Sequence, residues 1–163
     1  MTDRTRIVTS GLLLGLGLGG FFDGIVFHQL LGWHHMICTT DTCKPHTVAE
    51  LEWQNFTDGL FHAACWVLCI AGLGVLSSGD RLERFARPFF GWMTAGWGIF
   101  NVVEGLIDHI ILGIHHVRPG PSQGAWDIGF LVWGGLFTAL GWIIARRRRD
   151  APTPAGAAEH TTS

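Results

Sequence analysis

Four long apolar runs dominate the sequence and constrain its fold more than any other feature. They cover approximately residues 8–33, 56–77, 88–113 and 126–145. A helix needs roughly 17 to 25 apolar residues to cross the hydrocarbon core of a bilayer, so each run is long enough. Only 15% of the residues are charged, against roughly 25% in a typical soluble domain. We therefore expect an all-α integral membrane protein, a four-helix bundle formed by one domain over residues 1–149.

The first run has two further features. Its apolar stretch is longer than the apolar region of a cleavable signal peptide, so we expect it to be retained as a membrane helix. Glycines three and four residues apart over residues 11–20 let helix backbones approach closely in lipid. This spacing predicts a packing face.

The positions of the basic residues predict how the chain crosses the membrane, because cytoplasmic loops carry an excess of Lys and Arg. The loops over residues 36–55 and 114–125 contain only Lys44 and Arg118, and they are expected to lie outside. Both termini are expected in the cytoplasm of a plasma membrane, with a disordered tail over residues 150–163. Topology also explains the arginine clusters without a nucleic-acid partner. The cytoplasmic arginines are Arg4, Arg6, Arg81, Arg84, Arg87 and residues 146–149.

One motif occurs twice in the chain with the same spacing. The first copy is DGIVFHQLLGWHH, residues 23–35, and the second is EGLIDHIILGIHH, residues 104–116. Both contain an acid, a glycine, a histidine, a Leu-Gly pair and a final pair of histidines. A shorter echo follows each copy, TDGLF around Asp58 and WDIGF around Asp127. The sequence therefore predicts two tandem helix hairpins, related by a pseudo-twofold axis along the membrane normal.

Acids and histidines inside these apolar runs predict a metal site. A central Asp costs roughly 2.5 to 3.5 kcal/mol on insertion scales, so such groups usually bind something or each other. The predicted topology puts all of them in the outer half of the bundle. Imidazole and carboxylate ligands suit iron, zinc or cupric copper, and their number favours a di- or trinuclear cluster. The predicted ligands are Asp23, His28, His34, His35, Asp58, His62, Glu104, Asp108, His109, His115, His116 and Asp127.

A helical wheel adds detail to the second motif. Glu104, Asp108 and His115 fall within about 40° of one another on an α-helix and are expected to share a face. Glu104 and Asp108 are therefore candidate proton acceptors in a catalytic reaction. His109 and His116 form a second line.

Two other interpretations of the histidines stay open. Histidines in membrane helices are often hydrogen-bond partners between helices, although this role explains the duplicated spacing less well. Two facing histidines such as His28 and His109 could instead be the axial ligands of a haem. A haem would leave the five acids unexplained, and its propionates would repel them.

The four cysteines fall into two pairs. Cys38 and Cys43 lie in an outer loop, where an oxidising compartment favours a disulfide. Metal binding together with His46 is the alternative for this pair. Cys65 and Cys69 lie inside the second run, where small side chains commonly pack helices together.

Four blocks of the sequence resemble those of a known family. They are GGFFDGIVFHQLLGWHHM, DGLFH, NVVEGLIDHIILGIHHV and WDIGF. They resemble the bacterial predicted membrane proteins of domain-of-unknown-function family 2243, and the likeness covers nearly the whole chain up to the arginine cluster. The resemblance implies four membrane helices and a bacterial plasma membrane, and hints at a respiratory-chain or metal-delivery partner on the outer face. It implies no activity.

Two classes of function remain. The first is a membrane oxidoreductase whose metal cluster activates oxygen or a small substrate. The second is metal handling, such as delivery of a metal to a respiratory oxidase. Transport is disfavoured, because beyond His62 the inner half of the bundle offers few polar groups. We expect a metal-binding bundle that holds iron, copper or zinc, with catalysis as an extension of that role.

Overall fold

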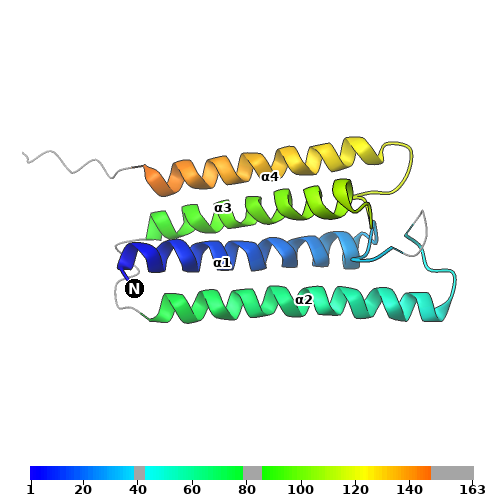
Figure 1. Ribbon diagram of the computed structural model, residues 1–163, viewed down its shortest axis with the longest axis horizontal. Helices are drawn as coiled ribbons and strands as arrows, with labels where there is room; N and C mark the ends of the chain where they lie inside the picture. Colours follow the sequence, from blue (N-terminus) through cyan, green and yellow to red (C-terminus); the bar gives the residue numbers. More distant parts are fainter. Residues whose placement is uncertain (39–42, 79–85, 148–163) are drawn as a thin grey trace, which may run out of the picture.

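The structure is a computed structural model that describes residues 1–38, 43–78 and 86–147. These ranges contain helices and loops and no strand, which confirms the all-α prediction (Figure 1). The predicted tail and four of the arginines, Arg81, Arg84, Arg148 and Arg149, lie outside the described residues. The helical segments are α1 (Asp3–Asp23), η1 (Gly24–Leu30), α2 (Val48–Ser77), α3 (Ala86–Glu104), η3 (Gly105–Ile111) and α4 (Gln123–Arg146).

Three helices in the described part of the chain are long and apolar enough to cross a membrane. They are α1 continued by η1 (Asp3–Leu30), α2 and α4. The fourth predicted run corresponds to α3 with η3, which is not apolar enough to join them. In the bundle, α3 lies between α1 and α4 (Figure 1).

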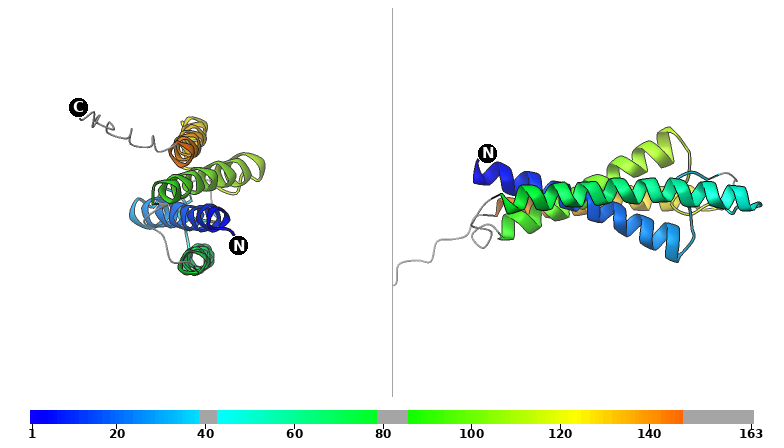
Figure 2. Two further views of the ribbon diagram at one scale, coloured as in Figure 1. Left: turned by 90° about the vertical axis from the view of Figure 1, so that its left-hand side faces the viewer. Right: turned by 90° about the horizontal axis from the view of Figure 1, so that it is seen from below.

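The helices form an open bundle in which they stand side by side in a row. The order along the row is α2, α1, α3 and α4 (Figures 1 and 2). α1 and α3 cross in the middle, and α2 and α4 each pack on one of these two helices. The N-terminus and the end of α4 lie at one end of the molecule. The segments that follow η1 and η3 lie at the other end (Figure 1).

Small side chains bring the central helices into close contact. A side chain at Gly15 would meet the backbone of α3 at Gly96. Other glycines of α1 face α2, where the sulfur atoms of Cys65 and Cys69 occupy the space that a side chain would need. Both cysteines are free thiols that pack against α1. The predicted packing face over residues 11–20 is confirmed.

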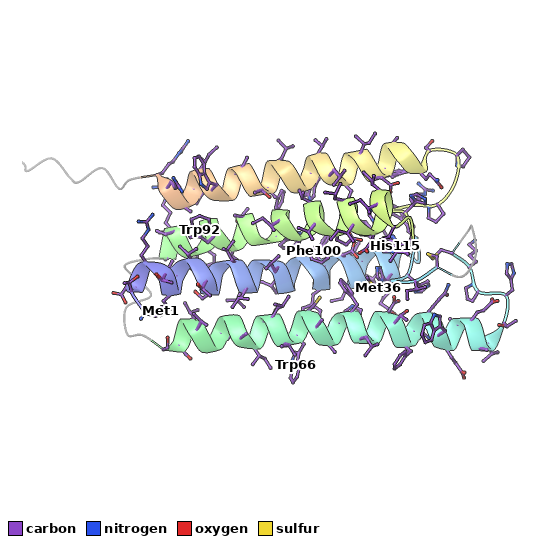
Figure 3. All side chains as sticks on the ribbon, viewed as in Figure 1. Met1, Met36, Trp66, Trp92, Phe100 and His115 are labelled. Carbon is purple, nitrogen blue, oxygen red and sulfur yellow. A yellow bond between two sulfur atoms is a disulfide. The ribbon has the colours of Figure 1, made fainter. Side chains whose placement is uncertain are left out.

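The two ends of the row differ in what they bury. The end with the N-terminus buries an apolar cluster built on Ile7, Leu14 and Phe89, whereas the opposite end buries acids and histidines. The outer faces are largely uncovered, since only 11% of the most apolar stretch of α2 and 17% of that of α4 is buried. Trp66 of α2, for example, points away from the other helices (Figure 3). Apolar surface of this extent suits contact with lipid.

The helix boundaries differ from the predicted ones for identifiable reasons. Gly32 and Gly113 take left-handed backbone conformations, with φ of +55° and +59°, which glycine adopts without steric cost. The chain therefore leaves the helix before each histidine pair, and the pairs lie in loops. α2 starts well before residue 56 because Thr47 and Glu50 form a capping box at its beginning.

Candidate metal centre

Each motif begins with a π-helical turn that brings its acid and its first histidine together. α1 passes into η1 after Asp23, and α3 passes into η3 after Glu104. Residues five apart lie on different faces of an α-helix, but the wider turn of a π-helix brings them to the same side. Nε2 of His28 thus lies 3.1 Å from the Asp23 carboxylate, and Nε2 of His109 lies 3.0 Å from that of Glu104.

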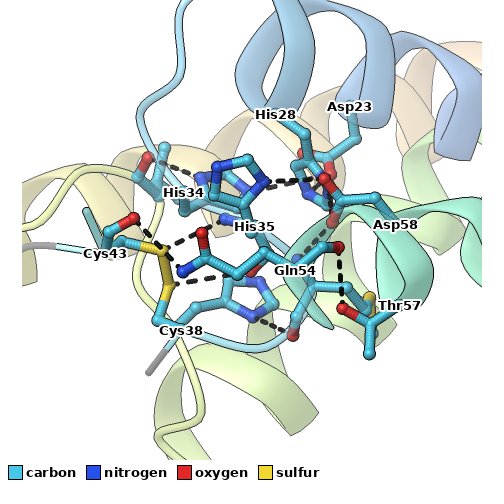
Figure 4. The surroundings of a disulfide bond; sticks show 12 residues. Asp23, His28, His34, His35, Cys38, Cys43, Gln54, Thr57 and Asp58 are labelled. Atoms are coloured by element: carbon cyan, nitrogen blue, oxygen red, sulfur yellow. Dashed lines mark hydrogen bonds and ion pairs between the residues drawn. A yellow bond between two sulfur atoms is a disulfide. The ribbon is translucent and has the colours of Figure 1, made fainter. Parts of the chain in front are cut away.

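The first motif is held by Asp58, an acid in the first half of α2. The carboxylate of Asp58 accepts hydrogen bonds from Nδ1 of His28 at 3.0 Å and from Nδ1 of His35 at 2.7 Å (Figure 4). It also accepts a bond from the backbone N–H of Met36 at 2.7 Å. Because Nδ1 of His28 is directed at Asp58, its Nε2 is directed at Asp23.

The second motif makes matching contacts with an acid at the start of α4. The carboxylate of Asp127 accepts a hydrogen bond from Nδ1 of His116 at 2.7 Å and one from the backbone N–H of Val117 at 3.0 Å. Nδ1 of His109 lies 3.6 Å from the same carboxylate. Asp127 therefore has the same role toward its motif as Asp58 has toward the first.

The middle histidines join the two motifs. Nδ1 of His34 donates to the backbone carbonyl of Val117 at 2.8 Å, and Nδ1 of His115 donates to that of Met36 at 3.1 Å. Met36 and His115 meet at the loop end of the row (Figure 3). The rings of His34 and His115 are stacked, with centroids 4.8 Å apart and planes inclined by 6°. Each motif therefore orients a histidine of the other.

These partners fix the proton positions of the middle histidines. A carbonyl oxygen only accepts hydrogen bonds, so a neutral imidazole bound to it carries its proton on Nδ1 and a lone pair on Nε2. Burial also lowers the pKa of His34 below its ordinary value, which favours the neutral ring. Nε2 of His34 nevertheless faces Asp23 at 3.8 Å, and that of His115 faces Glu104 at 3.0 Å. A proton on Nε2 of His115 makes its contact with Glu104 a hydrogen bond, and a proton or a metal ion between His34 and Asp23 would remove the repulsion of their lone pairs.

Six buried side chains converge in this way, and we call them the inner group. Each is at most 7% exposed. They form two sets, joined by His34, in which the potential ligand atoms lie within 4.8 Å of one another. Several of their atoms have no hydrogen-bond partner in the described part of the chain. The two sets are Asp23, His28 and His34, and His34, Glu104, His109 and His115.

Four other predicted ligands surround the inner group. Asp58 and Asp127 lie behind His28 and His109, on the Nδ1 side of each ring. His35 and His116 bind these acids from the outside, and their side chains are 15% and 30% exposed. We call these four residues the outer group, since they orient inner residues instead of converging with them.

Two predicted ligands lie apart from both groups. His62 packs between Gly24 and the ring of Phe21, whose centroid is 5.9 Å away. Asp108 is half-buried and forms no ion pair with the described histidines. The helical wheel places Asp108 beside Glu104, but the π-helical winding of η3 places the next residue there instead.

The two outer-loop cysteines form a disulfide beside the first motif (Figure 4). The backbone N–H of His35 lies 3.2 Å from the sulfur of Cys43. The disulfide thus braces the loop that carries the first histidine pair. His46, the alternative metal partner of these cysteines, is exposed, and its backbone N–H bonds to Glu50 at the start of α2.

Sequence reasoning missed the residue that follows each histidine pair. Met36 and Val117 each donate a backbone N–H to an outer acid and accept a hydrogen bond from a histidine of the other motif. These contacts involve only backbone atoms, so the identity of the side chain carries no signal for them. The one available clue is their position directly after His-His in both copies.

Comparison with known proteins agrees with the apolar character of the helices. The family model described as "Predicted membrane protein (DUF2243)" matches residues 10–148, a range that includes the whole inner and outer groups. No curated protein and no solved structure matches the chain. The chain therefore belongs to this family of predicted membrane proteins, whose function is unknown.

Proposed function

We propose that this protein is a membrane metalloprotein that binds two transition-metal ions within its inner group. The proposal rests on one observation. In the inner histidines, Nε2 is directed toward a buried carboxylate and Nδ1 is directed toward a separate acceptor. The proposed ligands are Asp23, His28 and His34 for one ion and Glu104, His109 and His115 for the other.

The hydrogen bonds behind the rings support this proposal. A histidine that binds a metal usually donates its other ring N–H to a carboxylate or a backbone carbonyl. His34 and His115 donate to backbone carbonyls, and His28 donates to Asp58. For His109, the nearest acceptor behind the ring is Asp127 at 3.6 Å. Nε2 of His28, His34 and His109 has no hydrogen-bond partner in the described part of the chain, and such ions would satisfy these buried atoms.

The donor set narrows the choice of metal. Two histidines and one carboxylate are the ligands of many non-haem iron(II) sites, and the same set also binds catalytic zinc. The proposed set has no sulfur donor, which disfavours cuprous copper. Such an ion supplies a Lewis acid with open coordination positions, and iron adds redox chemistry. We also propose that the protein is an oxidoreductase, which requires a redox-active ion, and this donor set favours iron over copper.

Burial of the ligands favours a resident cofactor over a metal that is handed to another protein. His28, His34, His109 and His115 are each at most 3% exposed. Release would require the two motifs to separate, because each motif holds a histidine of the other. Metal delivery to a respiratory protein is therefore the weaker alternative.

The packing of the rings argues against a haem. His34 and His115 lie stacked between His28 and His109, and successive ring centroids along this series are 4.6, 4.8 and 4.8 Å apart. A porphyrin does not fit between the rings of His28 and His109, because the rings of His34 and His115 fill the space between them. The inner carboxylates would also lie against its negative charge.

The proposal includes the topology of the protein. We propose two tandem hairpins in a plasma membrane, with α3 and η3 as the fourth crossing and both termini in the cytoplasm. The matching contacts of the two motifs support the repeat. Arg4 and Arg146 support the orientation, because they lie at the end of the row where α1 begins and α4 ends (Figure 1).

The test replaces one histidine of each motif and counts the metal. We expect two ions per chain in the detergent-purified protein, about one after His28→Ala or His109→Ala, and none in the double variant. His46→Ala, in an exposed loop, is the matched control and should retain both ions. An absorption spectrum of the same samples distinguishes iron from zinc. Unchanged metal content in the folded double variant would refute the proposal.

A further inference from the structure

A cavity of about 420 Å³ lies beside the inner group, between η1, α3 and α4. Trp126 and Trp133 at its edge are 41% and 50% exposed, so it opens on the outer surface of the helix row. We call it the aromatic pocket, because six aromatic rings form most of its wall. These rings are Phe22, Phe27, Trp33, Trp126, Phe130 and Trp133.

The aromatic pocket shares a wall with the candidate metal centre. The rings of Phe27 and Phe130 meet edge to face, with centroids 6.3 Å apart. On the far side of this pair, Phe27 lies 6.0 Å from His34 and Phe130 lies 5.4 Å from His109, centroid to centroid. The pocket is therefore one ring away from the inner group, but none of the six inner side chains lines it.

Two polar side chains stand out in this apolar surface. Asn101 of α3 lines the pocket and is only 3% exposed. Its side-chain amide has no hydrogen bond to the described residues. At the outer rim, the guanidinium carbon of Arg118 lies 5.1 Å from the ring centroid of Trp33 and 5.6 Å from that of Trp126. Both side chains offer N–H donors to a bound molecule.

Four of the six aromatic rings have no aromatic counterpart at the matching positions of the duplicated sequence. At the positions that match Phe27, Trp33, Trp126 and Trp133, the chain has Asp108, Ile114, Thr57 and Ala64. The second motif forms its Glu104–His109 pair, and α2 contacts His28 through Asp58, without an aromatic side chain at these matching positions. The contacts of the candidate metal centre therefore do not require these four rings, which favours a separate role for them.

We propose that the aromatic pocket binds a lipid-soluble molecule of the quinone or quinol class, whose ring carries oxygen substituents. Its volume lies within the roughly 300–1,000 Å³ of typical small-molecule pockets. Flat rings stack favourably on aromatic side chains, and the opening on the membrane-facing surface suits entry from lipid. A ring oxygen would pair with the Asn101 amide, which an acyl chain would leave without a hydrogen bond.

The inference goes beyond the proposed metal site and does not depend on it. The test uses the protein in lipid nanodiscs and measures binding of a benzoquinone with a ten-carbon tail by titration calorimetry, with empty nanodiscs as the blank. The quinone should bind saturably at one site per chain. It should bind at least about tenfold tighter than decylbenzene, which has a ring and tail but no oxygens. Equal binding of both compounds would identify a lipid-chain site and overturn the proposal.

Two variants locate the bound molecule. Gly129→Leu places a side chain in the pocket, where nothing lies within 4 Å of a new Cβ, and should abolish binding. The matched control is Gly59→Leu, at an exposed glycine of α2 that has the same free space. Asn101→Leu should weaken quinone binding about tenfold and leave decylbenzene binding unchanged. Wild-type quinone affinity in either Gly129→Leu or Asn101→Leu would overturn the assignment.

A third variant tests whether quinone binding depends on the proposed metal site. The double variant His28→Ala/His109→Ala lacks ligands for both proposed ions but keeps every residue that lines the pocket. It should bind the quinone within about twofold of the wild-type affinity. Loss of binding in a folded double variant would contradict an independent pocket. Failure of the metal proposal alone would leave quinone binding intact.

Discussion

The two histidines at the end of each motif have different roles. These roles differ in which group the Nδ1 atom of each ring contacts. His34 and His115 turn Nε2 toward inner carboxylates and anchor Nδ1 on the other motif. His35 and His116 instead use Nδ1 to hold an outer acid. The pair His-His thus supplies one residue of the inner group and one residue that orients an outer acid. Replacing either member should have distinct effects on the metal.

The inner acids can be tested one at a time. Asp23→Asn and Glu104→Gln each replace a carboxylate ligand by an amide of the same shape, so each should lower the metal content from two ions per chain to about one. Asp108→Asn is the control, because this acid lies outside the inner group. It should retain both ions. Elemental analysis of the three purified variants measures the outcome, and metal loss in Asp108→Asn alone would reverse the assignment.

The outer acids should matter for affinity more than for occupancy. Asp58→Asn keeps the shape of the side chain but removes the charge that orients His28 and His35. Loss of such a partner typically weakens metal affinity about 10- to 100-fold. Competition with a soluble chelator measures the change, and Glu52→Gln at an exposed position of the same helix is the control. An unchanged affinity would show that Asp58 does not orient a ligand.

Both helices that contribute to the inner group, α1 with η1 and α3 with η3, end in the same way. A π-helical turn is followed by a glycine in the left-handed conformation, and the histidine pair comes next. The π turn aligns the acid with the first histidine, and the glycine turns the chain so that the pair reaches back over the bundle. The geometry of the ligands thus depends on how two helices end.

Replacing the turning glycine should lower stability. Gly32→Ala leaves enough space for the methyl group, since nothing lies within 4 Å of a new Cβ. The left-handed backbone at φ +55° nevertheless costs an alanine about 1 to 2 kcal/mol. Thermal unfolding in detergent should therefore shift downward. Gly59→Ala, within α2 and equally unobstructed, should raise stability by about 0.5 to 1 kcal/mol. Stabilisation by Gly32→Ala would contradict this account.

The sequence predicts the helices and the region of the site better than it predicts the contacts. Apolar runs reveal the helices because hydrophobic length is a property of the sequence itself. The histidines and acids were recognisable because they are costly in lipid. The wheel, however, assumes α-helical winding, so it pairs Glu104 with Asp108 instead of His109. The sequence also does not show which histidine of each pair belongs to the inner group, because His34 and His115 are oriented by backbone carbonyls of the opposite motif.

The whole molecule is a row of four helices whose central pair carries the inner acids and first histidines. α2 and α4 contribute one outer acid each and expose most of their apolar surface. The two motifs meet at the loop end, and the aromatic pocket opens beside them. This arrangement puts a buried polar centre within reach of molecules dissolved in lipid.

The proposed topology predicts which parts of the chain are accessible from each side. A fluorescent protein fused after residue 163 should fluoresce, because it folds in the cytoplasm. An alkaline phosphatase fused after residue 120 should be active, because it requires the outer compartment for its disulfides. The reverse fusions, a fluorescent protein after residue 120 and a phosphatase after residue 163, serve as controls and should be inactive. Phosphatase activity at the C-terminus would contradict the proposed cytoplasmic location of that terminus.

The metal-to-protein ratio of the purified wild-type protein is the most direct measurement. Samples expressed with iron, zinc or copper supplied would be compared by elemental analysis after removal of weakly bound metal. Two converging sets of buried ligands predict two ions per chain of one preferred metal. A ratio near zero under every condition would contradict this result. The inner group would then be a network of protonated histidines and carboxylates that holds the helices together.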